Sequence, residues 1–152
     1  MFLANVVWPA LFLTERILTW WAIGLGLPIE YLAVRQITQF NPKKAIITLV
    51  VINLASSLLG IVLIPFVGII WEVFPGILLF KLFNWGTFNP LTWIANLFLA
   101  GLVNAFVEGE TIKRIFKYKL TRKEYILLFI ANLITVGVAL ASLALYPPKY
   151  YR

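Results

Sequence analysis

The sequence predicts an all-α integral membrane protein with four transmembrane helices arranged as two hairpins. Its 152 residues are 62% hydrophobic and only 12% charged, whereas soluble domains are about half apolar and a quarter charged. A soluble fold of this size could not bury so much apolar surface. Three uncharged runs, 45–71, 82–107 and 125–148, each exceed the roughly 20 residues needed to cross a bilayer.

These runs, together with a less regular one at the start, predict spans at 15–34, 45–64, 90–110 and 125–145. Pro42 and the Asn89-Pro90 pair are typical of the first turns of the second and third helices. We expect the second span to end near residue 64, because Pro65 and Gly68 are poor residues for a helix interior. The two prolines at 147 and 148 are expected to stop the fourth span.

Two apolar segments remain outside these spans, residues 1–14 and 65–88. The second contains Trp71, Glu72, Lys81 and Trp85, and Trp and Lys favour the headgroup layer of a membrane. Each segment directly precedes a span. We therefore expect interfacial or re-entrant segments before the first and third helices, within a single membrane domain over 1–152.

The basic residues predict the orientation of the chain. Nine of the 13 Lys and Arg residues fall in the predicted loops at 35–44 and 111–124. By the positive-inside rule, both hairpin loops are cytoplasmic, or stromal in an organelle, and both termini lie on the opposite side. The pattern fits a bacterial inner membrane or a thylakoid-like membrane.

The two hairpins resemble each other in sequence, which indicates an internal repeat of 1–64 and 72–146. Each copy has a Glu, then an Arg, a basic pair and an apolar run with one Asn. Glu30 and Asn53 match Glu108 and Asn132 if one residue is inserted. Because each copy holds two spans, both copies have the same orientation, which is a parallel repeat. The alternative is that topology alone placed basic residues in both loops.

Small and polar residues mark one face on the second and fourth spans, which we expect to be the central helices of a four-helix bundle. In the second span these are Asn53, Ser56, Ser57 and Gly60, and in the fourth they are Asn132, Thr135, Ala139 and Ser142. Their helical spacing favours close packing and hydrogen bonds between helices.

Glu30 and Glu108 are the candidate functional residues, because an ionisable group within a span is costly. With Asn53, Asn132 and Asn104, they could hold a proton or a small cation. The alternative is structural, because both Glu residues lie near the cytoplasmic ends of their spans. There they could brace the hairpins through a hydrogen bond or an ion pair with Arg.

The second predicted loop carries a second candidate site, in which basic and aromatic residues alternate. Such clusters attract anionic lipids and can also dock partner proteins. The residues concerned are Lys113, Arg114, Lys117, Lys119, Arg122 and Lys123.

The composition excludes several kinds of site. The chain has no Cys, no His and no Asp, so the commonest metal ligands and general bases are missing, and we expect neither a metal nor an enzyme activity. The net charge of +7 lies in loops between apolar runs and does not indicate nucleic-acid binding. We expect no cofactor besides bound lipid, and the many aromatic residues leave a pigment or quinone open.

These observations favour an accessory or scaffold subunit that packs against other integral membrane proteins. The alternative is a small transporter or channel, coupled to protons or ions, that acts as a homo-oligomer through Glu30 and Glu108. A lipid-binding or membrane-shaping protein is a third hypothesis.

Overall fold

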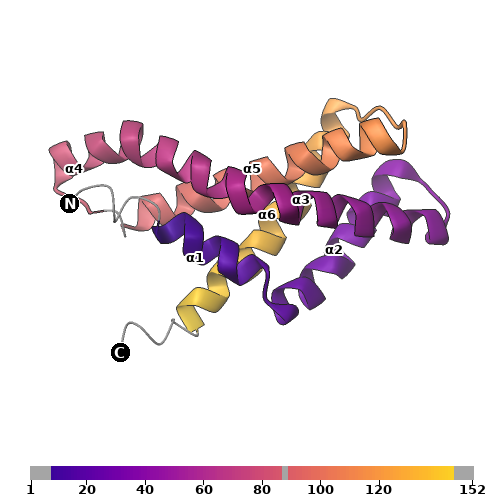
Figure 1. The fold of residues 1–152 in the computed structure, drawn as a ribbon, viewed down its shortest axis with the longest axis horizontal. Coiled ribbons are helices and arrows are strands. Elements are labelled where there is room, and N and C mark those ends of the chain that lie inside the picture. Colours follow the sequence, from indigo (N-terminus) through magenta and orange to yellow (C-terminus); the bar gives the residue numbers. More distant parts are fainter. Residues whose placement is uncertain (1–7, 87–88, 146–152) are drawn as a thin grey trace.

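The computed structural model describes residues 8–86 and 89–145, and this part of the chain is helical with no strand (Figure 1). The elements are α1 (Trp8–Ile17), α2 (Trp20–Thr38), α3 (Pro42–Trp71), the π-helical turn η2 (Glu72–Gly76), α4 (Ile77–Phe83), α5 (Pro90–Ile115) and α6 (Arg122–Leu145). Three continuous helices are long and apolar enough to cross a membrane, and α1 with α2 forms a fourth candidate span that is bent by 74°. The all-α membrane fold is therefore supported.

The first predicted span, 15–34, is wrong at its start. The chain turns between α1 and α2, where the backbone N–H and the side-chain hydroxyl of Thr19 both donate to the carbonyl oxygen of Arg16. α2 then begins at Trp20. A hydroxyl side chain that bonds to the nearby backbone competes with helix formation, which explains the break.

The second span does not end near residue 64. α3 continues through Pro65 and Gly68, and with η2 and α4 it forms one helix of 42 residues, which Figure 1 shows crossing the whole molecule. A proline removes only one backbone donor, and membrane helices tolerate it. Gly68 lies in close contact with its neighbours, since an added Cβ would come within 2.7 Å of the Ala10 Cβ. Pro75 lies in η2, where the helix widens.

The predicted first turns of the second and third helices are confirmed. Asn41 precedes Pro42, and its Oδ1 accepts a hydrogen bond of 2.9 Å from the backbone N–H of Lys44. Asn89 precedes Pro90 and accepts in the same way from Thr92. α6 is described to Leu145, so the two prolines predicted to stop it lie outside the described residues.

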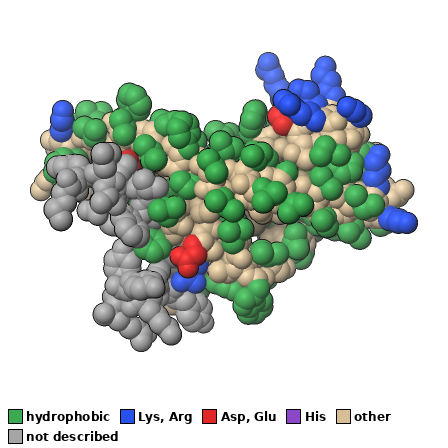
Figure 2. Space-filling view, in the orientation of Figure 1, with side chains coloured by type: hydrophobic (Ala, Val, Ile, Leu, Met, Phe, Trp, Pro, Cys, Tyr) green, Lys and Arg blue, Asp and Glu red, His purple; other side chains and the backbone are tan. Residues whose placement is uncertain are grey.

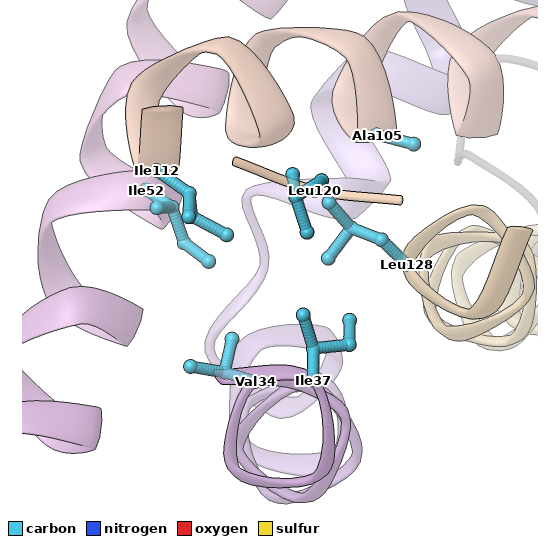
Figure 3. Close-up of a cluster of buried hydrophobic side chains, with 7 residues drawn as sticks. All are labelled: Val34, Ile37, Ile52, Ala105, Ile112, Leu120 and Leu128. Atoms are coloured by element: carbon cyan, nitrogen blue, oxygen red, sulfur yellow. The ribbon is translucent and has the colours of Figure 1, made fainter. Parts of the chain in front are cut away.

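The third and fourth spans, rather than the second and fourth, are the most buried. α5 packs between α3 and α6, while α3 turns a long row of Val, Leu and Ile side chains outward. The largest apolar cluster joins both hairpins near their loops (Figure 3). It consists of Val34, Ile37, Ile52, Ala105, Ile112, Leu120 and Leu128.

α1 belongs to the interior of the bundle. Ala10 and Leu13 are buried in a second apolar cluster with Ile64 of α3, Ala100 of α5 and Val136 of α6. This packing fits the re-entrant or broken-span form of the expected segment better than a helix lying on the surface. In the other expected segment, α4 buries none of its residues.

The two basic loops lie at the same end of the molecule, as Figure 2 shows by its gathering of Lys and Arg side chains. The ring of Phe40, after α2, contacts the rings of Phe116 and Tyr118, after α5. The Tyr118 hydroxyl also lies 2.9 Å from the carbonyl oxygen of Ile37. Which side of a membrane this end faces stays a prediction, and the predicted position of the termini lies outside the described residues.

Candidate functional site

A cavity of about 50 Å³ lies between the helices of the bundle. It is lined by polar and apolar side chains of α1, α2, α3, α5 and α6, and it is partly open to the outside. It is large enough for a few water molecules or a small ion. Both candidate glutamates line it. The polar lining consists of Thr14, Glu30, Asn53, Ser56, Ser57, Asn104, Glu108 and Thr135.

Glu108 of α5 is 1% exposed, and two side chains hold its carboxyl group. The Asn132 amide of α6 donates to Oε2 over 2.7 Å, and the Ser56 hydroxyl of α3 lies 3.2 Å from Oε1. The Asn132 amide also donates to the carbonyl oxygen of Leu128, one turn earlier. The carboxyl group is thus oriented from two neighbouring helices.

Glu30 of α2 is 3% exposed and is less completely held. Asn53 of α3 and Thr135 of α6 approach its carboxyl group, while its Oε2 has no hydrogen-bond partner among the described residues. The Oδ1 atom of Asn132 is in the same condition. Buried acceptors without a donor are costly, so both atoms favour a proton, a water molecule or a cation beside them.

The contacts of the two glutamates follow one pattern. Each Glu is approached by the Asn of its own hairpin, Asn53 for Glu30 and Asn132 for Glu108. Each is also approached by a hydroxyl residue from the other hairpin, which lies three positions after that hairpin's Asn. These residues are Thr135 for Glu30 and Ser56 for Glu108.

The packing of the helices follows the same pattern between the two hairpins. The second helix of the first hairpin, α3, packs on the first helix of the other, α5, and likewise α6 packs on α2. Both asparagines also donate to the backbone carbonyl four residues earlier, Asn53 to Leu49 and Asn132 to Leu128. The pattern is the one that a pseudo-two-fold axis through the cavity would give, and the internal repeat itself stays a prediction.

Asn104 also lines the cavity, although it is not hydrogen-bonded to Glu108, one turn later on the same helix. It lies opposite Gly60 of α3, where an added Cβ would be 3.6 Å from the Asn104 Oδ1. All five residues of the predicted site, Glu30, Glu108, Asn53, Asn132 and Asn104, therefore lie in or beside one cavity.

No Lys or Arg lines the cavity in the part of the chain that the structure describes. Glu110 forms ion pairs with Lys113 and Arg114, whereas Glu30 and Glu108 form none with an Arg among the described residues. Glu30 and Glu108 are close enough to interact electrostatically. Two carboxylates in one buried site cannot both stay ionised without a counter-charge.

Ser56 and Thr135 are contacts of the two glutamates that the sequence did not assign to the candidate site. Both belong to the predicted packing faces, and both are buried there. The signal was present in the spacing, because each lies three residues after the repeated Asn and therefore on the same helix face.

The six basic residues of the second loop are all exposed and share one end of the molecule with Lys43 and Lys44 (Figure 2). Lys113 and Arg114 pair with Glu110, at 3.2 and 3.1 Å. The arrangement suits an anionic surface, and a lipid or protein ligand for it stays a prediction.

No protein-family model, curated protein or solved structure matches this chain significantly. Among the described residues, no group of three or more His, Cys, Asp or Glu side chains could hold a metal ion. The chemistry of the site is therefore that of two carboxyl groups with amide and hydroxyl neighbours.

Proposed function

We propose that this protein binds a proton or a monovalent cation at the Glu30–Glu108 pair and moves it across the membrane. The observation that carries the proposal is that two buried glutamates from different hairpins line one cavity, which has no Lys or Arg in its lining among the described residues. A membrane-embedded ionisable residue is a functional hypothesis by default, and here two such residues converge.

The free ligand positions favour a single positive charge. The carboxyl oxygens of Glu108 already accept hydrogen bonds from Ser56 and Asn132, whereas Oε2 of Glu30 has no donor. One proton or one monovalent cation would neutralise the repulsion between the two carboxyl groups.

Flux through reconstituted vesicles tests the proposal. The full chain is placed in liposomes, and uptake is followed under a pH gradient in one arm and under Na⁺ or K⁺ gradients in the other. We expect flux in one arm and its loss in Glu30→Gln and in Glu108→Gln, since the amide keeps the shape of the side chain and removes its charge.

Glu15→Gln is the matched control, because Glu15 is an exposed residue of α1 that does not line the cavity. All variants must elute from gel filtration as the wild type does. Wild-type vesicles without flux in any arm, or full flux in both glutamine variants, would rule out this function. The mass of the detergent particle decides whether the active form is a homo-oligomer.

A second candidate function, an accessory subunit of a membrane complex, is favoured by α4. The helix formed by α3, η2 and α4 has 42 residues and would be about 63 Å long, twice the roughly 30 Å of a hydrocarbon core. Its last segment exposes Ile77, Leu78, Phe80, Leu82 and Phe83. An upright helix of this length would need apolar cover beyond the lipid, and another integral membrane protein would supply it.

Extraction in a mild detergent tests this candidate. We expect a partner membrane protein to co-purify in fixed stoichiometry with the wild type, and to be lost when Leu78 and Leu82 are both changed to Ser. The matched control changes Leu54 and Leu58, which are equally exposed but lie mid-span on α3. A particle that contains this chain alone would contradict the accessory role.

A further inference from the structure

A continuous row of facing residues joins the cavity to the far half of the molecule. α3 and α5 are antiparallel, and every fourth residue of one faces every fourth residue of the other. We call this row the α3–α5 seam; it pairs Ser56, Gly60, Ile64 and Gly68 of α3 with Glu108, Asn104, Ala100 and Asn96 of α5, and it continues to Glu72, just after α3, and to Thr92 near the start of α5.

The contacts along the seam are regular. Ser56 lies at hydrogen-bond distance from Glu108, and Gly60 faces the Oδ1 atom of Asn104. Gly68 faces the Oδ1 atom of Asn96, which an added Cβ would approach to 3.2 Å. At the far end, the indole nitrogen of Trp71, next to Glu72, donates to the Thr92 hydroxyl over 3.3 Å.

Glu72 and Asn96 are buried polar side chains that lack full partnering. Glu72 is 8% exposed and Asn96 is 2% exposed. The Oε1 atom of Glu72 and the Oδ1 atom of Asn96 have no hydrogen-bond partner among the described residues. Such acceptors favour a proton or a cation, as the free oxygen of Glu30 does.

Glu72 lies in the π-helical turn, and its carboxyl group is held over Gly76. A Cβ at that glycine would come within 2.7 Å of the Glu72 Oε2. Single π-helical turns within α-helices occur frequently at functional sites. Between Ser56 and Glu72 lie 16 positions, about 24 Å of helix, which is most of the thickness of a hydrocarbon core.

The seam is polar or small throughout except at one point. Ile64 is buried opposite Ala100, in the same apolar cluster, and it also forms part of the cavity wall. Together with the rest of this cluster, which includes Leu13 of α1 and Val136 of α6, it separates the Glu30–Glu108 cavity from Asn96 and Glu72. An apolar constriction in a polar path blocks ions because water does not fill it.

We propose that Glu72 is a second binding group for the same proton or monovalent cation, and that Ile64 is the apolar gate between it and the Glu30–Glu108 pair. This inference rests on the proposed function, because it assumes that the transported ion passes from one acidic group to the other along the α3–α5 seam. The gate can be tested separately, by measuring passive leak of ions through the reconstituted protein.

The test opens the gate and measures leak. The full chain with Ile64→Ser is reconstituted, and passive H⁺, Na⁺ and K⁺ flux is compared with wild type. Val62→Ser is the matched control, since Val62 lies two residues away on the same helix and is 67% exposed. We expect a several-fold rise in H⁺ or in one cation's flux with Ile64→Ser, and none with Val62→Ser.

The same measurement with Ile64→Ser and Glu72→Gln combined assigns the second group, and we expect the leak to be lost. Equal flux in Ile64→Ser and Val62→Ser would overturn the gate, and a leak that survives Glu72→Gln would overturn the role of Glu72. If Ile64→Ser does not fold, Glu72→Gln alone must lower wild-type flux several-fold, and unchanged flux would overturn the inference.

Failure of this inference is distinct from failure of the proposed function. A Glu72-dependent leak in Ile64→Ser, with no wild-type transport, would support the seam and rule out the transport role. Wild-type transport that requires Glu30 and Glu108 but is unchanged by substitutions at Ile64 and Glu72 would support the transport role and rule out the role of the seam.

Discussion

Asn53 and Asn132 have equivalent positions, although they lie on different hairpins. Each contacts the Glu of its own hairpin, and each also donates to a carbonyl oxygen of its own helix. Hydrogen bonds between membrane helices contribute modestly, because the unfolded chain in the membrane also finds partners. Their value here lies chiefly in fixing the direction of the two carboxyl groups.

We expect Asn53→Leu and Asn132→Leu each to lower the free energy of unfolding by about 1 kcal/mol. Unfolding in mixed detergent and SDS, followed by circular dichroism, measures this loss. Asn132→Leu should cost at least as much as Asn53→Leu, since its bond to Glu108 is short and fully buried. A loss in one variant and none in the other would contradict the paired arrangement.

Two glycines of α2 provide a matched test of the packing behind Glu30. A Cβ at Gly26 would lie 2.5 Å from the Cγ2 atom of Thr135, whereas a Cβ at Gly24 would meet nothing within 4 Å. We expect Gly26→Ala to destabilise the fold by about 1–3 kcal/mol, because the β-branched Thr135 has little freedom to move. It should also displace Thr135 from Glu30.

Gly24→Ala is the control, and it should leave stability unchanged or raise it by up to about 1 kcal/mol through the helix preference of alanine. Thermal unfolding in detergent compares the two variants. Similar transitions for both would mean that α2 and α6 are not packed as closely at Gly26 as described.

At the residue scale, the sequence predicted which side chains gather at the site but not which atoms meet. Intramembrane Glu and Asn residues are rare enough to stand out, so Glu30, Glu108, Asn53 and Asn132 are recognisable from the amino-acid sequence alone. Ser56 and Thr135 are not, because small hydroxyl residues are common on any packed membrane helix. Only the crossing of α3 over α5 and of α2 over α6 assigns them to the glutamates.

Helix boundaries show where local rules fail at the scale of elements. The caps at Asn41 and Asn89 were predictable, since a cap is made by residues within one turn. The continuation of α3 past Pro65 was not, because tertiary contacts at Gly68 and the widened turn at η2 outweigh the local cost of proline. The bend after α1 depends in the same way on the burial of Leu13 inside the bundle.

Tyr118 connects the two hairpins at their loop end. Its hydroxyl lies 2.9 Å from the Ile37 carbonyl oxygen and 2.7 Å from Oε1 of Glu124. The hydrogen bond to Glu124 raises the pKa of Tyr118 above its usual value of 10.0. A group whose pKa is raised in the folded state stabilises the fold below its unfolded pKa, and this contribution is lost as the pH rises through the folded value.

We therefore expect Tyr118→Phe to lower the free energy of unfolding by about 1 kcal/mol at neutral pH. The difference from wild type should stay constant up to about pH 9 and shrink above pH 10, where the wild-type hydroxyl ionises. Unfolding measured from pH 7 to pH 11 checks both parts. A difference that grows with pH, or that is absent at pH 7, would contradict a hydrogen bond donated by the Tyr118 hydroxyl.

At the scale of the whole molecule, the basic residues of the loops are separated from the buried acidic residues. Glu30, Glu108 and Glu72 are buried, while the basic residues of the two loops gather at one exposed end (Figure 2). Composition predicted this separation, because charge was confined to short segments between apolar runs. The α3–α5 seam between the buried acids was not predictable, since it depends on the register of two helices that are distant in sequence.

The exposed basic end should bind anionic lipid. Each basic residue near such a surface contributes about 1 kcal/mol, so Lys117→Gln combined with Lys119→Gln should weaken binding by about 2 kcal/mol, or roughly 30-fold. Both side chains are exposed, and neither lies in the Glu30–Glu108 cavity. Binding of the detergent-solubilised chain to vesicles with and without anionic lipid, at low and high salt, measures the effect.

Lys81→Gln is the control, because Lys81 is exposed and belongs to α4, which lies at the opposite end of the molecule from the basic loops (Figure 1). It should leave the binding unchanged, while 1 M salt should abolish most of it by shortening the screening length to about 3 Å. Binding that is unchanged in the loop variants but weakened by Lys81→Gln would mean that the α4 end, and not the loop end, contacts the anionic lipid. The orientation inferred from the basic loops would then have to be reversed together with it.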